Sequence, residues 1–235
     1  MNWSELSVDG GSLAAGLLAM GLAVATVGVG AWVAYVAYSG YRESGDRPTL
    51  VLAVGIALAS AVHTSVRIGL PTAGASSALT DTAAVAIQVV GLGLVLYAIY
   101  GRPEHADRRV LGGVVGAGTL LFLAPLVAVD QAIIAPSTAS TGVNGIAAVV
   151  GGFVATQAYR GYRRYDSRPM LLLAGGILLL TVGSLIAGYV TDALWAASDA
   201  MVLAVIGSVE LGGLLLILQS LTNDSQWAVR SSRPF

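Results

Sequence analysis

Residues 37–58 read AYSGYRESGDRPTLVLAVGIAL, and residues 158–179 read AYRGYRRYDSRPMLLLAGGILL. Thirteen of these 22 positions are identical at a constant offset of 121 residues. The identities include Tyr, Arg and Pro, which a bias toward Ala, Val and Leu does not produce by chance. Repetition of this kind predicts that the chain contains two copies of one structural unit.

On both sides of these stretches the chain consists of uncharged apolar runs. Seven such runs lie roughly at 12–38, 48–70, 79–101, 110–131, 143–160, 169–190 and 197–221. A helix of about 20 apolar residues crosses the hydrocarbon core of a bilayer, which is ~30 Å thick. Of the 235 residues, 56% are hydrophobic and 11% are charged, a composition that excludes an ordinary soluble domain. The sequence predicts an all-α membrane protein with seven transmembrane helices, inserted in the cell membrane.

The two similar stretches occupy equivalent places in two groups of three spans. Repeat 1 covers residues 11–101, repeat 2 covers 143–221, and the span at 110–131 links them. A unit of three helices begins and ends on opposite sides of the membrane, so an extra helix lets the second copy keep the orientation of the first. We therefore expect one integral membrane domain, residues 1–235, built as a 3+1+3 parallel repeat about an axis along the membrane normal.

The basic residues indicate how this domain is oriented. All 12 are Arg, and eleven of them lie on one side of the predicted spans, in the links after the first, third and fifth spans and in the C-terminal tail. The N-terminal tail and the other three links contain none. Cytoplasmic segments of membrane proteins are enriched in Arg and Lys, so this distribution predicts an external N-terminus and a cytoplasmic C-terminus.

Several residue types and motifs are missing from the sequence. The absence of Cys excludes disulfides, thiolate metal sites and a Cys nucleophile. The absence of Lys excludes a retinal Schiff base, a pyridoxal lysine and a Walker-type phosphate loop. The sequence has no metalloprotease, paired-carboxylate or nucleophile–base motif, and a net charge of −1 gives no reason to expect nucleic acid as a partner. We expect a non-enzymatic protein with no cofactor and no bound metal.

Two short motifs resemble those of a known family. They are AYRGYRR at 158–164 and VLYAIY at 95–100. On these motifs the repeated unit resembles a short haloarchaeal three-helix membrane protein family of unknown function, over most of both halves but not the linking span. The resemblance implies a tandem duplication and transfers no functional residue. The 3+1+3 layout is also similar to that of the sugar-transporting SWEET family, but the Pro-Gln signature of that family is missing.

Six polar residues within the spans or at their ends are candidates for a ligand-binding pocket. They are His63, Arg67, Asp81, Gln88, Asp199 and Glu210. An ionisable group at helix depth costs roughly 2.5–3.5 kcal/mol on insertion scales, so each one requires an explanation. His63 and Arg67 share a helix face, and Glu210 lies about 20 Å into the last span. The sequence predicts an outward-facing pocket for a small anionic or zwitterionic solute, or for a proton relay.

Most of these residues also have a structural explanation. Asp81 and Asp199 open their spans, where the helix dipole and N-capping favour an acidic residue. Arg67 is shallow enough to extend to the lipid headgroups or to form one structural ion pair. A lone membrane histidine such as His63 can be held simply by a neighbouring carbonyl or hydroxyl group.

The third helices of the two predicted units can be aligned as well. LTDTAAV at 79–85 faces ASDAMVL at 197–203, after a gap of three residues. This alignment pairs the first acidic residues of the two helices, and it places Glu210 opposite apolar residues near Leu92. The repeat therefore gives no structural reason for the charge of Glu210.

The predicted cytoplasmic links form a second candidate surface. It combines aromatic and basic residues from the links after the first and fifth spans: Tyr41, Arg42, Arg47, Tyr162, Arg163, Arg164 and Arg168. Each Arg at a membrane surface contributes about 1 kcal/mol against anionic headgroups, so membrane lipid is one candidate partner. A cytoplasmic protein with an acidic surface is the other. Gly112 and Gly116 form a small-xxx-small pair that favours helix contact or a homo-oligomer.

Two functions follow from these features. The small size, the duplicated unit and the missing catalytic constellation favour a sensor or accessory module that binds a partner or a small ligand. The polar residues inside the spans favour a small-solute or proton-coupled transporter that uses the outward-facing pocket, against which stands the lack of helices broken by Pro. Both functions remain open at the level of the sequence.

Overall fold

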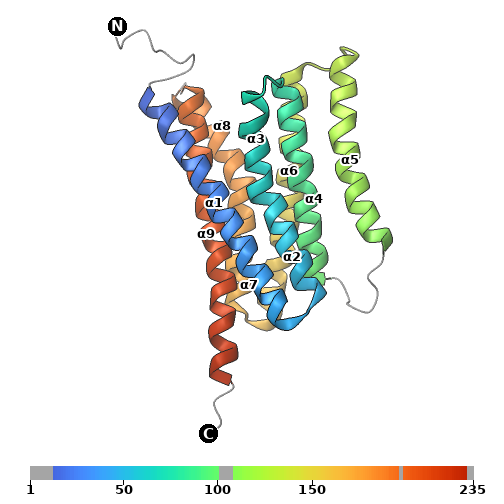
Figure 1. Ribbon diagram of the computed structural model, residues 1–235. Helices are drawn as coiled ribbons and strands as arrows, with labels where there is room; N and C mark the ends of the chain where they lie inside the picture. Colours follow the sequence, from blue (N-terminus) through green and yellow to red (C-terminus); the bar gives the residue numbers. More distant parts are fainter. Residues whose placement is uncertain (1–12, 101–107, 196–197, 232–235) are drawn as a thin grey trace.

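The computed structural model describes residues 13–100, 108–195 and 198–231, and this part of the chain is helical apart from short turns (Figure 1). Two of the elements, η2 and η4, are π-helical. In chain order the elements are α1 (Leu13–Ser44), α2 (Arg47–Ala57), η2 (Leu58–Val62), α3 (His63–Thr72), α4 (Ser77–Tyr100), α5 (Arg108–Asp130), α6 (Pro136–Tyr165), α7 (Arg168–Leu178), η4 (Leu179–Gly183), α8 (Ser184–Trp195) and α9 (Asp199–Ser231).

Seven helical stretches of the described residues are long and apolar enough to cross a membrane. They are α1, α2–η2–α3, α4, α5, α6, α7–η4–α8 and α9, which confirms the seven apolar helices predicted from the sequence. Among the 18 most apolar consecutive residues of α5, only 6% are buried inside the protein, so this helix exposes apolar side chains over most of its surface. Large exposed apolar surfaces indicate contact with lipid or with another protein, and here they indicate a multi-pass membrane protein.

The helices at the Arg-rich end are longer than the apolar runs. α1 continues to Ser44, and α6 has 30 residues, whereas the sequence predicts a short fifth span at 143–160. That prediction is wrong at both ends, because polar residues at 137–142 and 161–165 interrupt the apolar run without ending the helix. Pro136 lies in the first turn of α6, where a helix tolerates it. The predicted links after the first and fifth spans are therefore helix ends, joined by two-residue turns at 45–46 and 166–167.

Several backbone features recur at a separation of 121 residues. Gly45 and Asp166 follow the first helix of each half with left-handed φ angles of 68° and 50°. Glycine adopts this conformation freely, and Asp tolerates it better than most residues. The π-helical segments begin at Leu58 and Leu179, again 121 residues apart. The same turn and the same helix irregularity thus occur at corresponding positions of the two halves.

The core lies where the two halves meet. α1 packs against α2 and α9, and α6 packs against α7 and α4, so the first helix of each half contacts the third helix of the other. The buried side chains of this core also correspond: Ile56 and Ile177 are 121 residues apart, and Leu92 and Leu214 are 122 apart. α5 packs mainly against α4 and lies at one edge of the bundle (Figure 1).

Facing glycines bring the second and third helices of each half together. A Cβ added at Gly55 would lie 2.8 Å from the carbonyl oxygen of Gly91, and one added at Gly176 would lie 2.7 Å from that of Gly213. The third helices therefore correspond at 122 residues rather than at the 118 of the sequence alignment. The two offsets differ by four residues, which is about one helical turn. A shift of one turn keeps the apolar residues on the same helix face, so an alignment based on the apolar pattern does not detect it.

Candidate functional site

A cavity of about 360 Å³ lies between helices of both halves. Its wall includes the start of α6, the start of α9 and the end of α8, so it opens at the end of the bundle away from the turns at 45–46 and 166–167 (Figure 1). Ligand pockets commonly have volumes of ~300–1,000 Å³. The polar residues of the wall are His63, Arg67, Gln88, Ser140, Thr141, Asn144, Thr181, Ser184, Tyr189, Asp192 and Glu210.

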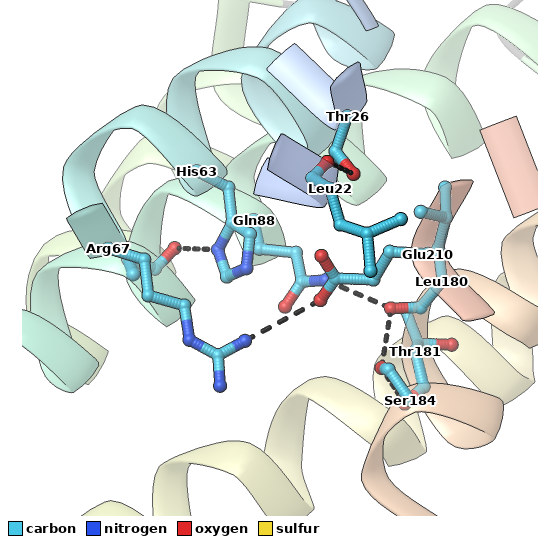
Figure 2. Close-up of polar contacts among 10 residues, drawn as sticks. Leu22, Thr26, His63, Arg67, Gln88, Leu180, Thr181, Ser184 and Glu210 are labelled. Carbon is cyan, nitrogen blue, oxygen red and sulfur yellow. Dashed lines mark hydrogen bonds and ion pairs between the residues drawn. The ribbon is translucent and has the colours of Figure 1, made fainter. Parts of the chain in front are cut away.

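Arg67 and Glu210 form an ion pair in this wall. Nη1 of Arg67 in α3 is 3.5 Å from Oε1 of Glu210 in α9, so the pair joins the two halves (Figure 2). The side chain of Glu210 is 9% exposed and that of Arg67 is 31% exposed. Strong charge-assisted contacts measure about 2.7–2.9 Å, so this pair is loose. A guanidinium group has five N–H donors, and most of those of Arg67 are not engaged by Glu210.

His63 is held by the backbone of the neighbouring helix. Its Nδ1 is 2.9 Å from the carbonyl oxygen of Ala84 in α4, and its side chain is buried (Figure 2). A carbonyl oxygen can only accept, so Nδ1 carries the hydrogen and Nε2 of the neutral ring is an acceptor. This contact with a carbonyl group agrees with the structural explanation given for His63 in the sequence analysis. The ring also lines the cavity.

The π-helical segment η4 supplies a backbone acceptor to the wall. The N–H of Ser184 bonds to the carbonyl of Leu179, one residue earlier than in an α-helix. The carbonyl of Leu180 accepts the hydroxyl of Ser184 at 2.9 Å, and Nε2 of Gln88 in α4 lies 3.5 Å from the same oxygen (Figure 2). The irregular turn thus connects Gln88 to the second half.

The start of α6 adds a polar strip to the wall. Ser140 donates a hydrogen bond to the carboxylate of Asp81 in α4. Nδ2 of Asn144 lies 2.9 Å from the carbonyl oxygen of Ser140 and donates to it. Ser140 and Asn144 are one turn apart and both line the cavity, whereas Asp81 contacts Ser140 and does not line the cavity.

The structure brings together four of the six residues predicted for a pocket: His63, Arg67, Gln88 and Glu210 (Figure 2). Asp81 contacts a residue of the wall but does not line the cavity. Asp199 begins α9, and its side chain lies outside the described residues. In the part of the chain that the structure describes, the carboxylate paired with Arg67 is that of Glu210, and not that of an acidic residue at a helix end.

The packing register changes the interpretation of Glu210. At the 122-residue offset Glu210 corresponds to Gln88, which also lines the cavity, so its placement opposite apolar residues near Leu92 is wrong. At the 121-residue offset Arg67 corresponds to Gly188. The wall therefore contains corresponding positions from both halves. Arg67 and Glu210 form a charged pair, whereas the corresponding residues Gly188 and Gln88 are uncharged.

Sequence reasoning missed the contribution of α6 and α8 to the wall. The missed residues include Ser140, Asn144, Ser184, Tyr189 and Asp192. Hydroxyl and amide side chains are common between membrane helices, so Ser140, Asn144 and Ser184 do not draw attention alone. Asp192 follows the predicted span at 169–190, where an exposed acidic residue needs no further explanation. One signal was available, because the apolar window of α6 is the least hydrophobic of the seven and the run of hydroxyl and amide residues lies at 137–144.

A basic–aromatic surface lies at the opposite end of the bundle, on the C-terminal ends of α1 and α6 and the starts of α2 and α7. The rings of Tyr38 and Tyr41 have centroids 6.0 Å apart, and those of Tyr159 and Tyr162 are 5.8 Å apart, at similar tilts. The Arg side chains of this surface are all exposed: Arg42, Arg47, Arg163, Arg164 and Arg168. The two halves thus present the same aromatic pair beside exposed guanidinium groups.

Comparison with known proteins gives a family match for the second half only. A family of unknown function (DUF7521) matches residues 141–222, which is about a third of the chain. This stretch runs from the first turns of α6 into α9 and includes Asn144, Ser184 and Glu210, but neither His63 nor Arg67. No curated protein and no solved structure matches the chain.

Proposed function

We propose that this chain is a non-enzymatic, multi-pass protein of the cell membrane that acts as a sensor or accessory module and binds a small polar ligand. The observation that carries the proposal is the ion pair of Arg67 and Glu210 in the wall of a 360 Å³ cavity. Ionisable groups inside a membrane are costly and mark functional sites by default. The corresponding residues, Gly188 and Gln88, are uncharged, so packing of the two halves does not require the pair.

The two halves are, in this proposal, copies of one unit in a 3+1+3 parallel repeat. Repeat 1 is α1–α4, α5 is the linking helix, and repeat 2 is α6–α9. The left-handed turns, the π-helical segments and the glycine crossings, which recur at 121 or 122 residues, support this assignment. The family match to 141–222 supports it as well, because it falls on the second half alone.

The pocket faces outward in the orientation that we propose, with the N-terminus outside and the C-terminus in the cytoplasm. The Arg residues of the basic–aromatic surface support this orientation, because positive charge concentrates on the cytoplasmic side of membrane proteins. The same surface is proposed to bind anionic membrane lipid, since Tyr and Arg at helix ends are suited to the headgroup layer. Contact with a cytoplasmic protein partner is the competing outcome for this surface.

Native mass spectrometry of the full chain, released from its membrane in mild detergent, tests the ligand-binding function. We expect a stoichiometric small molecule that is lost in Glu210→Gln and in Arg67→Ala. Asp130→Asn is the matched control, because Asp130 is an exposed carboxylate at the end of α5 outside the cavity wall. An empty pocket together with a stoichiometric protein partner would reject ligand binding and leave the role of accessory module.

A small-solute or proton-coupled transporter is the second candidate function. The π-helical segments favour it, because each lies in the interior of a span and η4 lines the pocket, and such irregular turns are frequent at functional sites. In proteoliposomes, the small molecule identified by mass spectrometry would then cross the membrane, and Glu210→Gln would abolish its flux. Flux that is equal in the variant and the unmodified chain would count against this function.

A further inference from the structure

Five side chains of the cavity wall each direct a hydrogen-bond donor to a backbone carbonyl oxygen. Nδ1 of His63 and Nδ2 of Asn144 each lie 2.9 Å from a backbone carbonyl oxygen. The hydroxyls of Thr181 and Ser184 donate to carbonyl oxygens at 2.8 and 2.9 Å, and Nε2 of Gln88 lies 3.5 Å from the same oxygen that Ser184 contacts. Because a carbonyl oxygen can only accept, the facing atom in each contact must be the donor.

These side chains also have acceptors that these contacts leave unused. They are Nε2 of the neutral His63 ring, the amide oxygens of Gln88 and Asn144, and the free lone pairs of the hydroxyls. The carboxylates of Glu210 and Asp192 add negative charge to the same wall. Within the described ranges, no three His, Asp or Glu side chains gather so as to hold a metal ion. A wall of this kind is complementary to an ammonium group, which has three N–H donors and a positive charge.

The guanidinium group of Arg67 is the strong donor of the wall. Its single contact with Glu210 is 3.5 Å long, and the side chain is 31% exposed, so its other N–H groups are open to the cavity. A planar guanidinium group suits a carboxylate, which it can bind through two N–H groups at once. Because Arg67 and Glu210 lie side by side, a ligand with an adjacent carboxylate and ammonium group would satisfy both without changing the net charge of the pocket.

The remainder of the wall is apolar and provides space for a side chain. It contains Ala147, Leu185, Val202 and Ile206. Gly188 lies in the same wall, at the position that corresponds to Arg67, so no guanidinium group fills this side of the cavity. The cavity therefore combines a charged part of opposite signs with an apolar part.

We propose that the pocket binds a zwitterionic α-amino acid with an apolar side chain. The carboxylate is bound by Arg67, the ammonium group by Glu210 and the neighbouring acceptors, and the side chain lies against the apolar wall. This identification rests on the ligand-binding function proposed above.

Isothermal titration calorimetry on the full chain in nanodiscs, with L-leucine as the probe, tests the proposal. Three analogues each lack one feature: isoamylamine lacks the carboxylate, 4-methylpentanoic acid lacks the ammonium group, and N,N,N-trimethyl-leucine lacks the N–H donors. L-valine and L-phenylalanine vary the size of the apolar group. We expect at least one of the three amino acids to bind. Each analogue of leucine is expected to bind at least tenfold more weakly than the tightest-binding of the three amino acids.

Two variants assign the charges to their partners. Arg67→Gln is expected to abolish the preference for the amino acid over the amine, and Glu210→Gln the preference for the amino acid over the carboxylic acid. A purely structural role of either residue would weaken all ligands alike. Asp130→Asn is expected to retain every preference, and each variant is first checked for a single symmetric peak in size-exclusion chromatography.

The outcomes separate this proposal from the function on which it rests. Equal binding of the amine and the amino acid would overturn it, as would a lack of binding by all three amino acids. A different small molecule that native mass spectrometry finds in the unmodified chain, and not in Glu210→Gln, would also overturn the ligand class but would leave the ligand-binding function standing.

Discussion

The guanidinium group of Arg67 is paired and partly exposed at the same time. This group contacts Glu210, and the side chain is still one-third exposed. The residue therefore combines an ion pair inside the bundle with partial exposure of its side chain. Its cost of burial is reduced on both counts, since a partner and partial solvation each lower the penalty for a charge.

The ion pair predicts a non-additive effect on stability. Glu210→Gln and Arg67→Gln are each expected to lower the free energy of unfolding by about 1–2 kcal/mol. This is less than the ~3–5 kcal/mol for breaking a fully buried pair, because Arg67 can turn to solvent. The double variant is expected to lose no more than either single variant. Reversible unfolding in mixed micelles measures the four free energies, and fully additive losses would contradict a direct interaction.

The sequence identifies the charged residues of the site but not their pairing. His63, Arg67 and Glu210 could be recognised because a charged or ionisable group in an apolar span needs an explanation. Their contacts depend on the rotation of α3 and α9 about their axes, which an apolar run of uniform hydrophobicity leaves undetermined. Asn144 and Ser184 were missed for the related reason that uncharged polar residues are inexpensive between helices.

Among the helices, close contacts are made where a glycine leaves room for backbone. Gly55 and Gly176 each face the carbonyl oxygen of a glycine in the next helix, at distances that a Cβ atom cannot occupy. Gly112 and Gly116 in α5 have open space at the Cβ position. A glycine count therefore does not distinguish helix crossings from open surface, and the structure does.

Replacement of these glycines by Ala tests the difference. Gly55→Ala and Gly176→Ala are expected to destabilise the protein by about 1–3 kcal/mol each, because the helices must separate. The controls Gly112→Ala and Gly116→Ala are expected to be neutral, or to stabilise by up to about 1 kcal/mol through helix propensity. Unfolding free energies in the same micelles provide the measurement, and equal losses at all four sites would refute the contact assignment.

The π-helical segment η4 leads to a second prediction at the level of the helices. Deletion of Val182 removes the extra residue of the π turn, so η4 becomes α-helical while α8 keeps its rotation. We expect a folded protein that no longer retains the small molecule seen by native mass spectrometry. Deletion of Ala187 within α8 is the control, because it rotates the rest of that helix by about 100° and is expected to prevent folding. Equal behaviour of the two deletions would contradict the role of η4.

For the molecule as a whole, the sequence predicts the fold class better than the limits of its helices. Seven apolar runs of membrane length are sufficient to predict seven helices, whatever their packing. The extension of α6 back to Pro136 could not be seen, because the polar residues at 137–144, of which Ser140, Thr141 and Asn144 line the cavity, interrupt the apolar run. A pocket therefore conceals part of the helix that forms it.

The chain contains no Cys, so the proposed orientation can be tested with single Cys variants that have no other thiol in the chain to label. Ser44→Cys lies at the end of α1 and Ala73→Cys lies in the turn after α3, and both positions are exposed. A membrane-impermeant maleimide is expected to label Ala73→Cys in intact cells, and Ser44→Cys only after the membrane is opened. The reverse pattern would reject the orientation with the N-terminus outside.

The exchange of partners between α1–α9 and α6–α4 has a consequence for shorter chains. In each proposed three-helix unit, the first and the third helix each turn one face to a helix of the other unit. A protein made of a single unit would leave both of these faces bare, and two identical chains could cover them by the same exchange. Such a homodimer would be symmetric, so an Arg at the position of Arg67 would be present twice. When two units are joined in one polypeptide, their sequences can differ, so one half can have a guanidinium group where the other has a glycine, Gly188.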